Sequence, residues 1–321
     1  MPWNNMSRRG FVKTAVMAAA GEHFLLRSKS VAAEPLNLPI GLQLDTVGSD
    51  FDSDPHGTLE KVAAIGYKQV ELSPVSKAPL SEIKKALADS GLKNPSGHHL
   101  LPDLLAHLHE RIETAKELGQ EYMIVTAPWV ADISRFQSKA SNRMELLRAV
   151  LNGLTLEDWK WNAEQFNKIG DQIKRAGLQL GYHNHEFEFR KIGESTGYDE
   201  FLRLTDSELV ALELDCGWMT VAGLDPVTYL TKYANRYRLL HIKDFKKGFM
   251  PTTTFRMGLS DAPGTPVPTE LGRGVIDYAR ILPAARDSIR ALFVEQEPPF
   301  NEMPALEAIK VDFAYLHNLK V

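Results

Sequence analysis

The chain has 321 residues, of which 44% are hydrophobic and 24% are charged, and its formal net charge is −4 at pH 7. This composition is ordinary for a globular protein with a large core, and the mildly acidic balance excludes an electrostatic surface for nucleic acid. The single cysteine, Cys216, excludes an internal disulfide, and no apolar stretch approaches the ~20 residues that a membrane-spanning helix needs.

The first residues carry the features of an export signal. The stretch Ser7–Lys13 reads SRRGFVK and resembles the twin-arginine motif. An apolar stretch follows at 14–20, and the small residues 31–33 offer a cleavage site for signal peptidase. A short polar run interrupts the apolar region, and a basic disordered tail is the alternative interpretation. We expect residues 1–33 to be a signal peptide and 34–321 to form the exported domain, which is then periplasmic or secreted.

After the signal, short apolar runs alternate with amphipathic stretches, which is the pattern of repeated βα units. Apolar side chains recur at helical spacing over residues 105–118, 159–173 and 306–316, and the middle stretch has Thr155 as a predicted N-cap and Gly177 as a predicted stop. Eight strands that each precede a helix predict a single-domain α/β fold, the (β/α)8 TIM barrel. The predicted strands are 39–44, 69–72, 94–98, 122–126, 178–183, 210–214, 238–242 and 292–295.

Two connections are longer than the others, residues 127–154 and 246–273. Both follow the C-terminal end of a predicted strand, and this is the end of the barrel where such enzymes build their sites. The second connection is rich in proline, glycine and threonine. We interpret it as a lid or a partner-contacting loop rather than a domain.

Four of the predicted strands end in pairs of polar side chains that stand two residues apart. Because a strand alternates its faces, the two members of each pair point the same way. The C-terminal ends of barrel strands meet at one mouth, so we expect these groups to share one site. The pairs are His183 with His185, Glu213 with Asp215, His241 with Lys243, and Glu295 with Glu297.

This pattern predicts a metal site. A carboxylate and an imidazole on neighbouring strands can meet at one ion, which makes Asp215 and His241 the first candidate ligands. Glu295 on the last strand completes the set across the barrel, and His183 or His185 gives a fourth ligand. Two nitrogen and two oxygen ligands suit one divalent ion, with Mn²⁺ as our first choice and Zn²⁺, Co²⁺ or Fe²⁺ as alternatives. Each residue alone would be an ordinary polar group at a barrel mouth, so the joint pattern carries the prediction.

Further side chains are expected at the same mouth. Glu71 and His98 end the second and third predicted strands, and Trp218 follows the sixth, so we expect all three to contact a substrate. His98 is equally suited to orient a metal ligand, and Trp218 to pack under a loop. Lys243 is a candidate to stabilise an oxyanion, or else to neutralise a neighbouring carboxylate.

Five short motifs stand in a fixed order along the chain: Gly181-Tyr-His-Asn-His185, Glu213-Leu-Asp215, His241-Ile-Lys-Asp244, Gly272-Arg-Gly-Val-Ile-Asp277 and Val294-Glu-Gln-Glu297. Together they resemble the xylose isomerase-like barrel superfamily, and within it the sugar phosphate isomerase/epimerase branch. The resemblance implies one divalent metal held by Glu, Asp, His and Glu side chains from strands five to eight. This set carries over directly onto Asp215, His241 and Glu295.

The first ligand departs from the family pattern. Many epimerases of the branch have Glu-Asn-His on strand five, where this chain has His183-Asn184-His185. The aligned position favours His183 as the ligand. In those epimerases the first and last glutamates act as acid and base on opposite faces of the sugar, so the imidazole argues against two-base epimerisation. Asp45 is a second departure, because an aromatic residue is expected there.

We therefore expect a metal-dependent sugar isomerase or epimerase that acts on a small carbohydrate. In this chemistry the metal ion lowers the pKa of the C–H next to a carbonyl, a base removes the proton, and an enediolate is stabilised. Glu295, Glu297 and His185 are the candidate acid and base groups, with Lys243 beside them. One alternative is a lyase or hydrolase of 3-keto glycosides that uses the same site, since some relatives cleave such compounds by elimination. The second alternative is a non-catalytic sugar-binding barrel.

Overall fold

The computed structural model describes residues 35–74, 76–256, 264–300 and 302–320. The predicted signal peptide lies outside the described residues, and so does part of the second long connection. Among the described helices, none combines the length and the apolar character needed to cross a bilayer.

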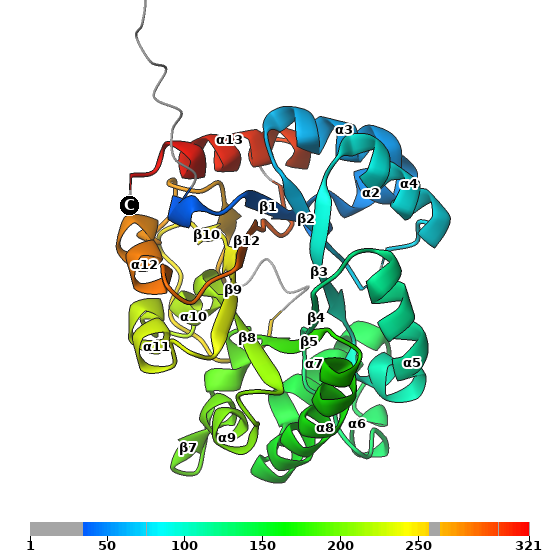
Figure 1. Ribbon diagram of the computed structural model, residues 1–321. Coiled ribbons are helices and arrows are strands. Elements are labelled where there is room, and N and C mark those ends of the chain that lie inside the picture. Colours follow the sequence, from blue (N-terminus) through cyan, green and yellow to red (C-terminus); the bar gives the residue numbers. More distant parts are fainter. Residues whose placement is uncertain (1–34, 75, 257–263, 301, 321) are drawn as a thin grey trace, which may run out of the picture. The chain divides into compact units, whose positions relative to one another are not determined.

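Eight parallel strands close into a barrel inside a ring of helices (Figure 1). The last strand pairs with the first, with Gly41 opposite Phe293, and this pairing closes the ring. The predicted barrel is confirmed, and every strand begins and ends within one residue of its prediction. In barrel order the strands are β1 (Ile40–Gln43), β12 (Ala291–Val294), β9 (Tyr237–Ile242), β8 (Val210–Asp215), β5 (Gln179–His183), β4 (Tyr122–Val125), β3 (Lys93–His99) and β2 (Gln69–Leu72).

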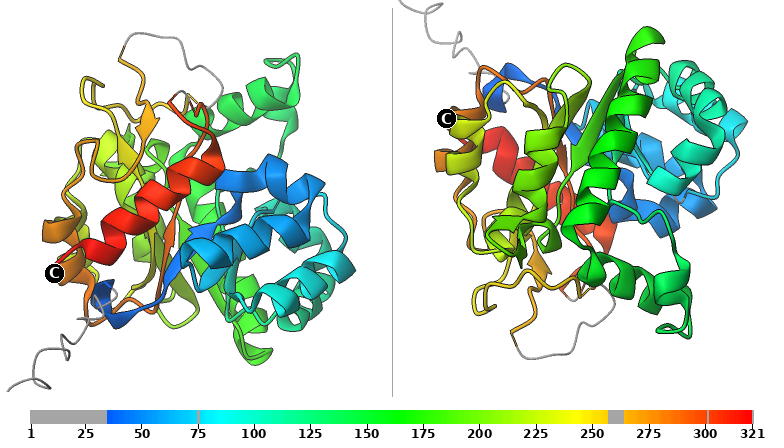
Figure 2. Two further views of the ribbon diagram at one scale, coloured as in Figure 1. Left: turned by 90° about the horizontal axis from the view of Figure 1, so that it is seen from above. Right: turned by 90° about the horizontal axis from the view of Figure 1, so that it is seen from below.

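The helices cover the outward faces of the strands (Figures 1 and 2). Helix α8 shows how the sequence specifies one of them: Thr155 and Asp158 form a capping box at its start, and Trp159 and Phe166 are buried. Gly177 follows its end with φ +86°, a conformation that favours glycine. The helices are α2 (Gly48–Ser53), α3 (Pro55–Ile65), α4 (Leu80–Ser90), α5 (Leu101–Glu117), α6 (Ser134–Gln137), α7 (Arg143–Gly153), α8 (Leu156–Arg175), α9 (Gly197–Leu204), α10 (Cys216–Val221), α11 (Pro226–Lys232), α12 (Tyr278–Ala285) and α13 (Ala305–Asn318).

An apolar cluster fills part of the barrel interior. Ile124, Leu239, Ala291 and Phe293 pack together there, and all four are buried. A Cβ at Gly41 would lie 2.4 Å from Cδ1 of Phe293, so only glycine on β1 leaves room for that ring. This cluster closes the interior next to the polar strand ends, since the ring of Phe293 lies 6.3 Å from that of His241.

The two long connections lie at the same end of the barrel (Figure 2). The first forms α6 and α7, and the second includes the short strands β10 (Asp244–Phe245) and β11 (Pro268–Thr269). Asn152 at the end of α7 joins them, because its amide donates to the carbonyl of Phe255 at 3.1 Å and accepts from the Phe255 N–H at 2.8 Å. The Asp244 carboxylate holds the base of the second connection by accepting from backbone N–H groups of five residues: Phe245, Gly272, Gly274, Val275 and Ile276.

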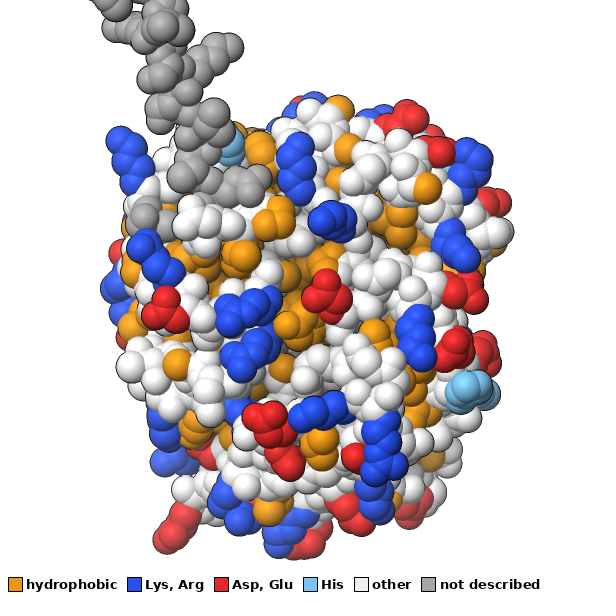
Figure 3. All heavy atoms as spheres, in the orientation of Figure 1, with side chains coloured by type: hydrophobic (Ala, Val, Ile, Leu, Met, Phe, Trp, Pro, Cys, Tyr) orange, Lys and Arg blue, Asp and Glu red, His pale blue; other side chains and the backbone are white. Residues whose placement is uncertain are grey.

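Basic and acidic side chains are interspersed with neutral and apolar ones on the face drawn in Figure 3. That face has no large area of a single charge sign, in keeping with the net charge of −4. Cys216, the single cysteine, is a buried thiol at the start of α10. The packed thiol expected from the sequence is confirmed.

Candidate active site

Three of the predicted metal ligands converge at the C-terminal mouth of the barrel. Asp215 ends β8, His241 lies near the end of β9, and Glu295 follows β12 directly. One ligand atom from each lies within 4.8 Å of the other two, and all three side chains are buried. His241 Nδ1 is 3.1 Å from Glu295 Oε2 and 4.0 Å from Asp215 Oδ2. We call this point the candidate metal site.

His183 reaches the same point from β5. Its Nε2 lies 3.7 Å from Asp215 Oδ2, while its Nδ1 is held at 2.9 Å from Glu213 Oε2. His185 also faces the mouth, but its ring packs against Phe187 with centroids 5.9 Å apart. The geometry thus gives His183, rather than His185, a free nitrogen directed at Asp215.

The residues at this point fit a divalent cation. Asp215 Oδ2 is buried and has no hydrogen-bond partner in the described chain, although the Lys243 ammonium lies 3.1 Å away. A buried acceptor without a partner is costly unless a positive group satisfies it. His183, Asp215, His241 and Glu295 together supply two nitrogens and two oxygens, a donor set that suits Mn²⁺, Zn²⁺, Co²⁺ or Fe²⁺.

A second layer of charged side chains orients the two imidazoles. Glu71 on β2 lies 2.7 Å from His241 Nε2, and Glu213 on β8 lies 2.9 Å from His183 Nδ1. Each contact leaves the other ring nitrogen directed at the candidate metal site, as carboxylates commonly do for metal-binding histidines. His98 on β3 joins the two carboxylates, with Nε2 at 2.9 Å from Glu71 and 3.1 Å from Glu213. We call Glu71, His98 and Glu213 the orienting layer.

Charge is balanced within the orienting layer. Burial acts to lower the pKa of His98, but the Glu71 carboxylate and the hydrogen bonds with Glu213 and Glu71 outweigh it and raise the pKa to about 10. Burial, with repulsion from Glu71 added to it, raises the pKa of Glu213 to about 7. For Glu71, the imidazoles of His98 and His241 outweigh burial and lower the pKa. His98 is therefore an imidazolium near neutral pH, held between two carboxyl groups.

Lys243 follows β9 and places its ammonium among three carboxylates. Its Nζ lies 3.1 Å from Asp215, 2.5 Å from Glu295 and 2.7 Å from Glu297. Burial opposes the charge of this lysine, but Asp215 and Glu295 outweigh burial and raise its pKa. A Cβ at Gly217 would lie 2.3 Å from Lys243 Cγ, so glycine is required for the lysine side chain to pass.

The neighbours of Lys243 resolve one open point from the sequence. Asp244, one of its two suggested partners, is bonded to backbone N–H groups, and Glu297 is the partner that Lys243 binds. Glu297 also accepts a hydrogen bond from the Trp218 indole at 3.1 Å. The structure therefore places Trp218 beside a predicted acid or base.

A cavity of about 700 Å³ opens above the candidate metal site. His98, His183, His185, Glu295 and Glu297 line it. Cavities of about 300–1,000 Å³ hold drug-sized ligands, so this one exceeds the needs of a monosaccharide alone. Further lining residues are Asp45, Pro74, Leu100, Thr126, Ala127, Met144, Leu147, Leu151, Phe255, Pro298 and Pro299.

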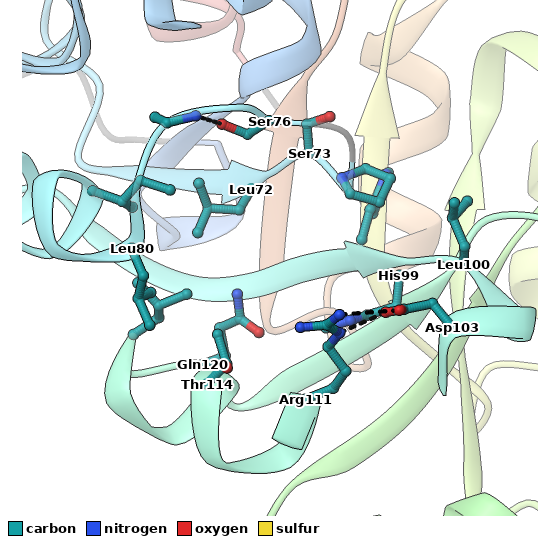
Figure 4. A pocket seen from close by; sticks show the side chains of 15 residues that line it. Leu72, Ser73, Ser76, Leu80, His99, Leu100, Asp103, Arg111, Thr114 and Gln120 are labelled. Carbon is teal, nitrogen blue, oxygen red and sulfur yellow. Dashed lines mark hydrogen bonds and ion pairs between the residues drawn. The ribbon is translucent and has the colours of Figure 1, made fainter. Parts of the chain in front are cut away.

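A second cavity of about 430 Å³ adjoins the first beside β3, and shares Pro74, His98 and Leu100 with it. Figure 4 shows Asp103 and Arg111 paired at its edge. The guanidinium donates to both carboxylate oxygens, at 2.6 and 3.0 Å. The charge of Arg111 is therefore neutralised within the protein.

The sequence reasoning missed several buried groups of this site. Glu213 was paired with Asp215 on one face, and this alternation was a sufficient signal for placing it beneath the ligands. Gln43, whose amide lies 3.0 Å from His98 Nδ1, stands two residues before Asp45 and was detectable in the same way. Glu188 had no such signal, because it lies beyond β5 and accepts from the His185 N–H and the Tyr182 hydroxyl.

The comparisons with known proteins agree with this architecture. An inosose dehydratase from Clostridium perfringens is 28% identical over 192 residues, which cover 59% of this chain and 63% of that relative. The match thus spans less than two thirds of the relative's own length.

Solved structures share the fold at lower identity. A sugar phosphate isomerase/epimerase from Parabacteroides distasonis has 23% identity and a TM-score of 0.67, covering 91% of this chain and 98% of its own. A 3-keto-D-glucoside 4-epimerase from E. coli has 16% identity and a TM-score of 0.59, covering 87% and 98%. The profile of one family matches residues 59–311, most of the barrel. The chain belongs to the xylose isomerase-like TIM barrel family.

Proposed function

We propose that this protein is a metal-dependent lyase that removes a proton next to the carbonyl of a keto-sugar or keto-cyclitol and expels the group on the following carbon. The observation that carries this is the convergence of His183, Asp215, His241 and Glu295 at the floor of a cavity that Glu297 and His185 also line. The similarity to an inosose dehydratase supports elimination over isomerisation, which the sequence alone favoured.

The reaction needs no co-substrate. The C–H bond next to the carbonyl breaks, its electron pair enters the C–C bond, and the carbonyl becomes an enolate. Return of these electrons expels water or an alcohol, which leaves with a proton, and an unsaturated ketone remains. A bound divalent cation supplies a positive charge that polarises the carbonyl and lowers the pKa of the adjacent C–H.

The chain's own residues provide the proton transfers. Glu297, fixed by Lys243 and Trp218, takes the proton from carbon. Burial, followed by the Lys243 charge, lowers the pKa of His185 to about 3, so its imidazole is neutral. A neutral imidazole has one N–H, which donates to the departing oxygen. Lys243 keeps Glu297 and Glu295 charged and in place.

Epimerisation is the second candidate function, and one observation favours it. His185 and Glu297 line the same cavity from β5 and β12, strands that β8 and β9 separate in the barrel. Two acid or base groups on different sides are what proton return to the opposite face requires.

Metal analysis and turnover in D₂O separate these functions. Purified protein is assayed for bound metal, stripped, reloaded with Mn²⁺, Zn²⁺ or Co²⁺, and incubated with 3-keto glycosides, a keto-cyclitol and free ketoses. Release of water or aglycone with formation of an enone supports the lyase, and deuterium in an intact sugar supports the epimerase. Glu297→Gln should abolish either outcome. Sugar binding without metal or turnover would leave only the non-catalytic alternative.

A further inference from the structure

The cavity above the candidate metal site has one polar end and one apolar wall. The polar end holds the candidate ligands and Glu297. The opposite side consists of six apolar side chains from α7, from the second long connection and from the chain after β12. We call these residues the apolar wall: Met144, Leu147, Leu151, Phe255, Pro298 and Pro299.

The apolar wall is attached to the catalytic end of the cavity. Asn152 hydrogen-bonds both backbone groups of Phe255, which fixes α7 against the second connection. The Phe255 ring lies 5.5 Å from Phe187 and 6.2 Å from His185, centroid to centroid. A ligand that reaches the candidate metal site therefore extends along a wall whose position is set by direct contacts with strand β5 residues.

The charges around the cavity do not suit a phosphate. The charged carboxyl side chains that line it are Asp45, Glu295 and Glu297, and no lysine or arginine is among its described lining residues. The nearest cations are engaged, because Lys243 is bound by three carboxylates and Arg111 by Asp103. Phosphate recognition relies on free cationic or backbone N–H donors, so an uncharged ligand matches this cavity.

We propose that the apolar wall is a binding site for an uncharged alkyl or aryl aglycone, so that the substrate is a neutral keto-glycoside rather than a sugar phosphate. This inference rests on the proposed lyase function and names its substrate class. The keto-sugar ring lies at the polar end, and the aglycone lies on the apolar wall. The C–O bond to the aglycone is the bond that breaks, and the aglycone leaves as an alcohol with one proton.

The test compares two substrates with similar leaving groups, methyl and hexyl 3-keto-β-D-glucopyranoside. Two or three buried methylene groups predict a kcat/KM about 10- to 50-fold higher for the hexyl compound. Met144→Ser and Leu147→Ser, at partly exposed positions of the wall, should each reduce this ratio at least threefold while the methyl compound reacts at nearly the wild-type rate. Leu105→Ser, an exposed leucine of α5 outside the cavity, should leave the ratio unchanged.

The outcomes separate the two proposals. Equal kcat/KM for the two compounds would overturn the aglycone site while the lyase function stands. If neither compound reacts, the lyase function fails, and the wall is tested by titrating hexyl β-D-glucopyranoside, which lacks the keto group, into the protein. Binding that is lost in Leu147→Ser supports the site, and no binding overturns it. Tighter binding of glucose 6-phosphate than of the hexyl glucoside would also overturn it.

Discussion

The orienting layer leads to a quantitative prediction for Glu213→Gln. Glu213 Oε2 lies 2.9 Å from His183 Nδ1, and 3.1 and 3.3 Å from the Nε2 atoms of His98 and His241. Glutamine keeps the size and one acceptor oxygen but removes the negative charge that three imidazoles face. Loss of such an outer carboxylate weakens metal binding by about 10- to 100-fold. Because Glu213 serves three rings, we expect the upper part of this range, about 30- to 100-fold, or about 2–2.7 kcal/mol.

The assay is a competition for Zn²⁺ and for Mn²⁺ between the metal-free protein and a chromophoric chelator. Circular dichroism establishes that the variant is folded, and Asp312→Asn, at a buried carboxyl of α13, serves as the matched control. His183→Ala should lose the metal, whereas His185→Ala should retain it. A folded Glu213→Gln protein that binds metal within about threefold of the wild type would refute the reasoning.

Three further changes are expected to have defined effects. Asp312 is buried with a pKa raised to about 7, so the native state holds a proton that the unfolded state releases at lower pH, and stability falls as pH rises from about 4 to 7. Asp312→Asn should remove this slope and gain at most ~4 kcal/mol on the wild type by pH 8 in urea titrations, whereas the exposed Asp287→Asn should not. Gly217→Ala should cost about 1–3 kcal/mol by crowding Lys243, and less in the Lys243→Ala background, as a double-mutant cycle would measure. Replacing both arginines of Ser7–Lys13 by lysine should block export, which cell fractionation measures; unchanged export would disprove the twin-arginine signal.

The barrel was predictable because each strand is a short apolar run bounded by turns. The register of β8 shows the reach of this reasoning, since alternation alone put Glu213 and Asp215 on one face. It did not reveal that the two carboxylates serve different layers, because that depends on which histidines enter from β3, β5 and β9. Likewise, the spacing of His241 and Lys243 predicted a shared mouth, but not the three carboxylates that surround the ammonium.

The cavity was not predictable, for a different reason. Met144 and Phe255 lie in the long connections, whose paths depend on contacts between distant segments. The hydrogen bonds between Asn152 and Phe255 join residues about one hundred positions apart, and no local pattern in either segment anticipates them. A helix such as α8, by contrast, carries its start signal and its buried face within its own twenty residues.

The order of the ligands along the chain has a consequence for biosynthesis. The four candidate ligands come from β5, β8, β9 and β12, and Glu295 is the last to leave the ribosome. A nascent chain that lacks β12 has neither the fourth ligand nor the partner of β1, so it can hold no ion in this arrangement. An ion that bridges these strands stabilises only the closed barrel, by mass action. Loading with metal would therefore mark a polypeptide whose synthesis is finished, and a prematurely terminated product would remain empty.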